Sequence, residues 1–189
     1  AVHNNEQTVV DLKDALDANF WADKTNTPAA VFGSSHSAMI IVKNILEQGG
    51  SVINFYRSPL KFAKKLSDWT LYDNTGLKGA TAKWVNTELV NYQGKIERYY
   101  SSADNINLHL NKCAYVAYAV GFKPRMLPIN GHAFSDYDQY HGIIANNIYG
   151  TGIAFPRRVI YPTGYSELNV GFLKFVRDLK QLLPIWLAN

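Results

Sequence analysis

Three small residues, Gly33, Ser35 and Ala38, follow a short apolar run with a spacing that suits phosphate binding. In the pattern G-x-G-x-x-G/A, such residues lie where a strand turns into a helix. The first residue allows a sharp turn, the second lets a diphosphate approach the backbone, and the third lets the helix pack closely on the strand. Serine at position 35 allows that approach less freely than glycine. The spacing predicts a site for the diphosphate of a dinucleotide.

The start of the predicted helix supplies the groups that would hold this anion. Its free N–H groups and the positive end of its dipole favour negative charge, and serine hydroxyls can add hydrogen bonds. The residues predicted to bind the diphosphate are Gly33, Ser34, Ser35, His36 and Ser37. Two alternatives stay open. A serine here can simply cap an ordinary helix, and the His36 imidazole can bond locally within the first turn.

The second half of the expected site lies about 20 positions further on, where an NAD site carries an acidic residue for the ribose 2′-hydroxyl. Here the chain has Tyr56, Arg57 and Ser58, none of which is a carboxylate. Arg57 can pair with a 2′-phosphate, with Ser58 as a neutral donor, so the sequence favours NADP(H) over NAD. The positive electrostatic potential expected at this position is strengthened by three nearby lysines, Lys61, Lys64 and Lys65. The alternative is a solvated basic surface.

The elements that must position these residues form a strand, a tight turn, a helix and a second strand over residues 29–57. The apolar run before Gly33 and the β-branched run after Gly50 are typical of buried strands, and residues 39–48 are apolar enough for a helix between them. A nearly all-apolar segment, residues 113–120, predicts a further central strand.

The remaining pattern predicts a leader helix over residues 1–27, a short helix over 59–66 and a helix over 80–92. Alternating residues predict a small antiparallel hairpin over 96–111. We expect an α/β fold, a Rossmann-like doubly wound parallel sheet that carries this hairpin and an irregular C-terminal extension ending in a helix. The expected boundaries are a leader over 1–27, an NAD(P)-binding domain over 28–123 and the extension over 124–189.

The extension is rich in proline and glycine and includes a second glycine-rich loop, residues 150–156. Its closing helix is expected over residues 168–183, with Pro184 as its end. The side chains expected to form its buried stripe are Val170, Leu173, Val176, Leu179, Leu182 and Leu183.

Composition excludes several other classes. The net charge of +4 is too small to indicate nucleic-acid binding, and a single cysteine, Cys113, excludes an internal disulfide or a C-x-x-C pair within this chain. We expect Cys113 to be an inert buried side chain. No apolar run reaches membrane-spanning length and the first residues do not resemble a signal peptide, so a cytoplasmic protein without membrane contact is expected.

Two other constellations are weak. His132 and His141 lie near Asp136 and Asp138, but the spacing does not supply a convergent metal-ligand set, and no metal is expected. The run from Gly33 to Ser37 lacks the final glycine of the G-x-S-x-G nucleophile turn.

Three segments together resemble a known layout: residues 31–38, residues 116–124 and residues 147–156. They resemble the pyridine nucleotide-disulfide oxidoreductase superfamily and its monooxygenase relatives, flavoproteins in which an NAD(P) domain is inserted into an FAD domain. The segment from Ala119 to Phe122 is similar to the family's A-T-G-F segment, where the chain returns to the FAD domain. The resemblance implies that Ala119 and Gly121 lie near the nicotinamide ribose or the flavin side of the cofactor site.

The chain also departs from that family. It has no G-x-G-x-x-G unit for FAD, Ile153 follows Gly152 where better-known members have an aspartate, and no redox cysteine pair is present. The disulfide-reductase branch is therefore disfavoured. The resemblance implies that the partner of this chain is a missing FAD-binding half.

The sequence thus predicts the NADPH-binding portion of a flavin-dependent oxidoreductase, which passes hydride from NADPH to FAD and is inactive as an isolated chain. It names no catalytic residue, and it leaves a homodimer open. One alternative is a stand-alone nucleotide-binding or sensing module without turnover. A dehydrogenase acting alone ranks last, because no suitably spaced Tyr and Lys, or His and Asp, stands out.

Overall fold

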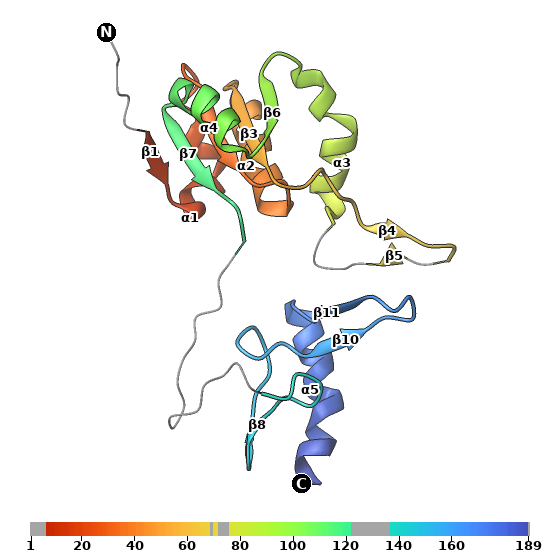
Figure 1. Cartoon of the computed structure of the whole chain (residues 1–189). Coiled ribbons are helices and arrows are strands. Elements are labelled where there is room, and N and C mark those ends of the chain that lie inside the picture. The colour runs from red at the N-terminus through yellow and green to blue at the C-terminus, as the bar shows by residue number, and fades with distance from the viewer. Residues whose placement is uncertain (1–6, 69, 72–75, 122–136, 189) are drawn as a thin grey trace. The chain divides into compact units, whose positions relative to one another are not determined.

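The computed structural model describes residues 7–68, 70–71, 76–121 and 137–188. The chain divides into two compact units, Ala1–Gly121 and Phe122–Asn189. Figure 1 shows the first unit in red to green and the second in teal to blue.

A five-stranded parallel sheet forms the centre of the first unit, in the order β1-β7-β2-β3-β6. Its strands are β1 (Thr8–Val10), β2 (Ala29–Phe32), β3 (Val52–Tyr56), β6 (Ile96–Tyr100) and β7 (Tyr115–Tyr118). From β2 the chain builds outward through β3 to β6, and it then returns to place β7 on the other side of β2. The direction of winding therefore reverses at β2. The predicted fold class, a doubly wound α/β sheet, is confirmed.

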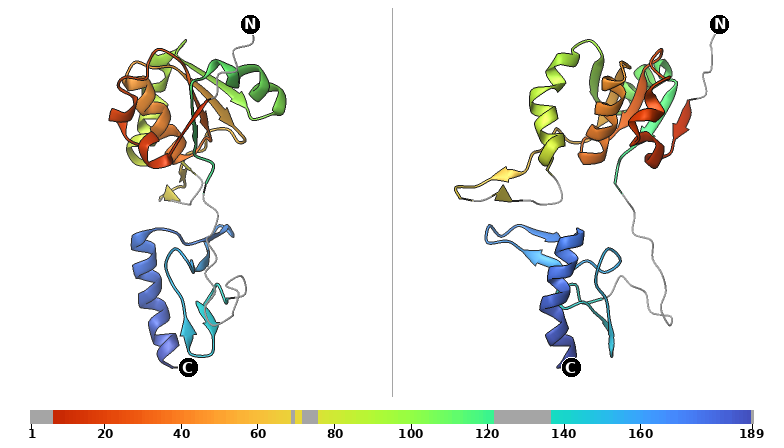
Figure 2. Two further views of the ribbon diagram at one scale, coloured as in Figure 1. Left: turned by 90° about the vertical axis from the view of Figure 1, so that its left-hand side faces the viewer. Right: turned by 180° about the vertical axis from the view of Figure 1, so that it is seen from behind.

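Helices cover both faces of this sheet, as the left view in Figure 2 shows. On one face lie α2 (His36–Glu47) and α3 (Gly79–Thr87), and on the other lies α4 (Ala103–His109). Ala29 and Val31 of β2 face α2, whereas Ala30 and Phe32 face the side of α4. Because both faces are covered, β2 is apolar at every position instead of alternating.

The start of the described chain differs from the expected leader helix. Thr8–Val10 forms β1 and pairs in parallel with β7, followed by α1 (Leu12–Ala15) and the 3-10 turn η1 (Ala18–Trp21). The β-branched residues in β1 suit a sheet position, which explains why the helical expectation is wrong there. Trp21 is buried, and its indole N–H donates to the Ala15 carbonyl at 2.9 Å.

The expected antiparallel hairpin over 96–111 is wrong in its second half. β6 pairs in parallel with β3, and the next residues form α4 with Ser102 as its N-cap and then the 3-10 turn η3 (Leu110–Lys112). Ile106 and Leu110, four residues apart, pack on the sheet, while Leu108 is exposed. Apolar residues at every second position also include pairs four residues apart, which suit one face of a helix. The sequence pattern therefore fits both a strand and a helix, and tertiary packing stabilises the helix.

The segment after β3 forms no helix either, against the expectation for residues 59–66. Instead β4 (Lys64–Lys65) pairs antiparallel with β5 (Thr70–Leu71), and Phe62 forms a bridge to Leu77. The helix expected over 80–92 is confirmed in outline as α3 followed by the 3-10 turn η2 (Leu89–Tyr92).

The described residues of the second unit, 137–188, form two antiparallel strand pairs and a helix. Its elements are β8 (Ile143–Ala145), β9 (Ile148–Tyr149), β10 (Arg158–Ile160), β11 (Ser166–Leu168) and α5 (Phe172–Leu187). The expected start of the closing helix is wrong, because Leu168 belongs to β11. The helix also continues beyond Pro184, since a proline in the last turn removes only one backbone hydrogen bond.

The inward face of α5 is centred on Asp178 and Leu182, both buried. Asn169 donates a 2.7 Å hydrogen bond to Asp178, so this buried carboxylate is paired. The expected buried stripe is therefore wrong at most of its positions: Leu182 is buried, but exposed side chains are found at Leu173, Val176, Leu179 and Leu183. In the described ranges, no helix has the length and apolar character needed to cross a membrane.

Candidate functional site

A pocket of about 570 Å³ lies in the first unit at the carboxyl ends of β2, β3 and β7. Its lining residues are Phe32, Gly33, Ser34, Ser35, Phe55, Arg57, Ser58, Pro59, Lys61, Ser101, Ile106, Tyr118, Ala119, Val120 and Gly121. The loops after β2 and β7 both contribute, and the winding reverses between these two strands. In open α/β sheets, ligands bind at this kind of reversal.

Gly33 forms the turn out of β2, and no other residue suits its position. Its φ of 129° lies in the left-handed range. A Cβ at this position would overlap the Ala119 carbonyl oxygen and would lie 3.1 Å from the Ala38 Cβ. Gly33 therefore allows the turn, and it also allows the close approach of β2, β7 and the start of α2.

The first turn of α2 begins directly after this glycine turn. Ser35 is the N-cap residue, but its side chain makes no capping hydrogen bond to the helix. The first helical bond runs from the Met39 N–H to the Ser35 carbonyl at 3.0 Å. The N–H groups of the preceding residues therefore have no partner within the helix, and they lie at its positive end. Ser35 occupies the N-cap position, but its side chain does not cap the helix, in contrast to the alternative of a simple capping serine.

The loop after β3 supplies the positive charge of the pocket. Arg57 and Lys61 are exposed and line it, together with Ser58. Arg57 makes no hydrogen bond or ion pair to any of the residues that the structure describes, so its guanidinium is available to a ligand. None of the described residues that line the pocket is acidic. Lys64 and Lys65, expected to contribute, lie in β4 and do not line the pocket.

A hydrogen bond joins the two loops. The Ser34 hydroxyl donates to the Ser58 carbonyl at 2.7 Å. It holds the loop after β2 against the loop after β3, so the two predicted phosphate-binding segments border the same pocket.

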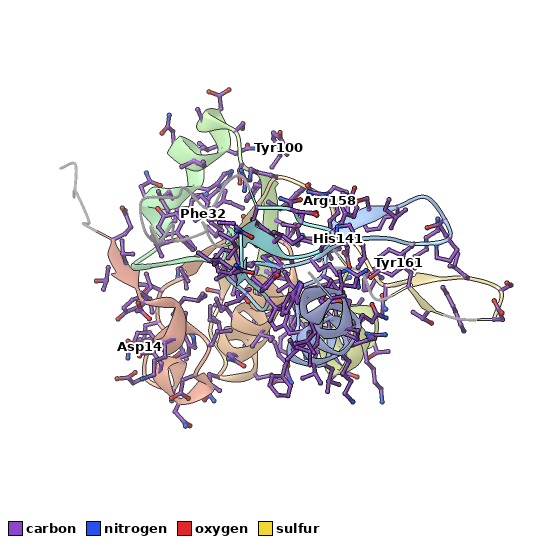
Figure 3. All side chains as sticks on the ribbon, turned by 90° about the horizontal axis from the view of Figure 1, so that it is seen from below. Asp14, Phe32, Tyr100, His141, Arg158 and Tyr161 are labelled. Atoms are coloured by element: carbon purple, nitrogen blue, oxygen red, sulfur yellow. The ribbon has the colours of Figure 1, made fainter. Side chains whose placement is uncertain are left out.

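Aromatic rings form one wall of the pocket, and sequence reasoning missed them. Phe32, labelled in Figure 3, stacks on Phe55 with centroids 4.8 Å apart and on Tyr118 with centroids 4.9 Å apart. These residues face one another because Phe32 is in register with both of them. The sequence did carry a signal, because each aromatic residue lies near the end of a strand expected in one parallel sheet. Such a wall can contact the flat ring of a ligand.

Ala119 and Gly121, in the segment that follows β7, also line the pocket. The Ala119 N–H donates to the Phe32 carbonyl at 2.8 Å, which extends the pairing of β7 with β2 as far as the Gly33 turn. Gly121 has a φ of 96°, and no described atom lies within 4 Å of a Cβ placed there.

Two predicted residues are not brought to the pocket. His36 and Ser37 are absent from its lining, and the His36 Nε2 shares a 3.3 Å hydrogen bond with the Thr81 hydroxyl on α3. The His36 ring thus bonds to α3, the helix beside it, and does not line the pocket. The backbone N–H groups of both residues remain in the first turn of α2.

The other reactive candidates form no second site among the residues that the structure describes. Burial raises the pKa of the Cys113 thiol to about 11, so the thiol stays protonated at ordinary pH. His132 and Asp136 lie outside the described residues. The Nδ1 of His141 lies 2.6 Å from the Asp138 carboxylate. Burial raises the pKa of Asp138, but the His141 side chain and the backbone N–H groups of Tyr140 and His141 together bring it below its ordinary value. Within the described ranges, no group of three or more His, Cys, Asp or Glu side chains could hold a metal ion.

Comparison with known proteins adds one relative. No protein-family model matches the chain. The chain is 32% identical, over 84% of its length, to the monooxygenase AgnR1 of Paecilomyces divaricatus. It spans 48% of that protein, about half its length. The similarity supports a relationship to monooxygenase-type oxidoreductases.

Proposed function

We propose that the first unit binds NADPH and that the chain is the NADPH-binding portion of a flavin-dependent oxidoreductase. The observation that carries this proposal is the convergence of three features on one pocket. These are the Gly33 turn, the start of α2 and the basic loop at Arg57, and they meet where the winding of the sheet reverses.

The pocket fits such a cofactor in size and in the chemistry of its lining. Its volume of about 570 Å³ lies in the range usual for small-molecule sites. The backbone N–H groups from Ser34 to Ser37 would hold the diphosphate, with the Ser35 hydroxyl as a further donor. Arg57 and Ser58 would hold the 2′-phosphate. The aromatic wall at Phe32 would exclude water from one side of a bound ring.

The choice of NADPH over NADH rests on charge. A carboxylate accepting from a ribose 2′-hydroxyl would repel a 2′-phosphate, and the described part of the lining contains no acidic residue. Arg57 instead offers a planar, permanently charged fork. Lys61, exposed on the same loop, adds to the positive potential.

The flavin part of the proposal rests on the similarity to the monooxygenase, which is about twice as long as this chain. We place the FAD-binding residues in a part of the whole protein that this sequence does not contain. There the flavin would accept hydride from NADPH, while the present chain fixes the position of the nicotinamide and shields it from water. Ala119 and Gly121, on the loop after β7, are the residues proposed to face that side.

Calorimetric titration of the purified chain with NADPH and NADH tests the proposal. We expect NADPH to bind more tightly, and Arg57→Ala to remove about tenfold of that preference, the size of one charge-assisted hydrogen bond at an exposed position. Lys83→Ala, an exposed lysine on α3 outside the pocket, is the matched control and should leave both affinities unchanged. Equal affinities in the unmodified chain, or no effect of Arg57→Ala, would overturn the assignment of Arg57.

A further inference from the structure

Asn54 is a fully buried amide in the middle of β3, with apolar neighbours on both sides in the strand. Its Nδ2 donates to the Val31 carbonyl at 2.9 Å and to the Gly33 carbonyl at 2.7 Å. Both NH₂ hydrogens of the amide are therefore used. A buried amide is costly unless it is satisfied, and here it is satisfied by the turn that borders the pocket.

Arg98, opposite Asn54 in β6, completes this arrangement. Its Nε donates to the Asn54 Oδ1 at 2.8 Å, and its guanidinium carbon lies 4.9 Å from the centre of the Tyr56 ring. Since Nε is only a donor, the amide oxygen of Asn54 must face Arg98, and the NH₂ group must face the two carbonyls. The orientation of the amide is thus determined from both ends.

The charge of Arg98 strengthens this chain of bonds. A cation that donates to the amide oxygen polarises the amide and makes its N–H groups better donors to the carbonyls beyond. Burial lowers the pKa of Arg98 below its ordinary value, and its Nη2 is buried without a hydrogen-bond partner among the described residues. This half-buried cation has no carboxylate partner among the described residues, and it bonds instead to the Asn54 amide behind the turn.

The Gly33 carbonyl belongs to the same peptide as the Ser34 N–H. In a planar trans peptide these two groups point in opposite directions. Fixing the carbonyl toward Asn54 therefore fixes the Ser34 N–H away from it. Ser34 lines the pocket, and its N–H is the first of those proposed to bind the diphosphate.

We propose that Asn54 and Arg98 are positioning residues for the nucleotide site, acting through the Gly33–Ser34 peptide. This inference rests on the proposed function, because the oriented N–H matters only where an anion binds. Neither residue touches the ligand. Arg98 fixes Asn54, and Asn54 fixes the peptide that faces the diphosphate.

The test uses Asn54→Asp, a nearly isosteric change in the full chain. The carboxylate still accepts from Arg98, but it cannot donate to the Gly33 carbonyl and repels it instead. We expect calorimetry to give about tenfold weaker binding of both NADPH and NADH, the equivalent of one hydrogen bond, with the ratio of the two affinities unchanged. Arg98→Met, which leaves the amide in place but unanchored, should weaken both by a smaller factor.

Val52→Ala is the matched control, because Val52 is buried on the same strand and faces the same side of the sheet. It should lower the melting temperature without changing either affinity. The chemical shift of the Ser34 amide in ligand-free, ¹⁵N-labelled protein is a second readout. It should change in Asn54→Asp and remain the same in Val52→Ala.

The outcomes separate this inference from the proposed function. If the unmodified chain binds neither nucleotide, the proposed function fails, and the Ser34 resonance alone decides whether Asn54 orients the peptide. If Asn54→Asp and Arg98→Met only lower the melting temperature, as Val52→Ala does, the two residues are structural and the inference is overturned. Should Asn54→Asp not fold, the nucleotide affinities and the Ser34 amide resonance are measured in Arg98→Met instead.

Discussion

The Ser34 hydroxyl donates a 2.7 Å hydrogen bond to the Ser58 carbonyl and so joins loops that are 24 residues apart in the sequence. One loop follows β2 and the other follows β3. In the proposed site, the first would hold the diphosphate and the second the 2′-phosphate. This bond therefore sets the distance between the two anion-binding segments.

Removing the bond with Ser34→Ala should weaken NADPH and NADH alike. The loops would no longer be held together, and the expected loss is about threefold to tenfold, as for a single neutral hydrogen bond. Calorimetric titration of each nucleotide measures the effect.

Ser58→Ala separates this role from a direct contact. It keeps the backbone carbonyl that accepts from Ser34 and loses only the hydroxyl proposed to face the 2′-phosphate. NADPH should therefore weaken while NADH does not. If both nucleotides weaken equally in Ser58→Ala, Ser58 does not contact the 2′-phosphate.

Gly33→Ala should abolish nucleotide binding and destabilise the first unit. A methyl group there would overlap the Ala119 carbonyl, and the positive φ adds a cost of about 1 to 3 kcal/mol for any other residue. Chemical denaturation measures the free energy of unfolding, and calorimetry measures binding.

Gly49→Ala provides the control for backbone strain alone. Gly49 has a φ of 90° but nothing within 4 Å of a Cβ at its position. It should lose about 1 kcal/mol of stability and keep its nucleotide affinity. If Gly33→Ala loses only as much stability as Gly49→Ala and keeps its nucleotide affinity, the close approach of Gly33 to Ala119 is not needed for binding.

Cys113 predicts how stability changes at alkaline pH. Burial raises the pKa of its thiol from 9.0 to about 11 in the folded chain. Between these values the unfolded chain releases the thiol proton and the folded chain retains it, so stability falls as the pH rises from about 9 to about 11. The loss is of the order of 3 kcal/mol, because each pKa unit between the two values corresponds to about 1.4 kcal/mol.

Cys113→Ala removes this contribution. The free energy of unfolding of the variant, measured by denaturation across the same range, should fall less steeply with pH than that of the unmodified chain. Identical slopes would show that the thiol is not protected by burial. In the native chain at neutral pH, the thiol should also react slowly with alkylating reagents.

The first βαβ unit could be predicted from the sequence because its signals are local. An apolar run, a glycine with small neighbours and a helical segment specify β2, the turn and α2 without knowledge of the rest of the fold. Gly33 is the best example, because a glycine between a strand and a helix predicts the positive φ that the structure has there.

Other features depend on partners far away in the sequence. The region of residues 103–109 carries an apolar spacing compatible with a strand or a helix, and packing against Phe32 and Phe55 decides for α4. The bond from His36 to Thr81 spans 45 residues. Asn54 and Arg98 meet only because β3 and β6 pair in a particular register. Each of these contacts requires the sheet order, which local patterns do not specify.

The closing helix illustrates a different limit. Its apolar stripe predicts a buried face, yet Leu173 and Leu183 are exposed and the inward face contains Asp178. The periodicity identifies an amphipathic helix correctly, but it cannot tell which face the rest of the second unit covers.

The most direct measurement is a titration of the ¹⁵N-labelled chain with NADPH, followed by NMR. We predict that the amide resonances of Ser34, Ser35, Arg57 and Gly121 shift together and saturate at one dissociation constant. Saturating shifts confined to residues outside the pocket, or no shifts at these four positions, would contradict the assignment of the pocket as the nucleotide site.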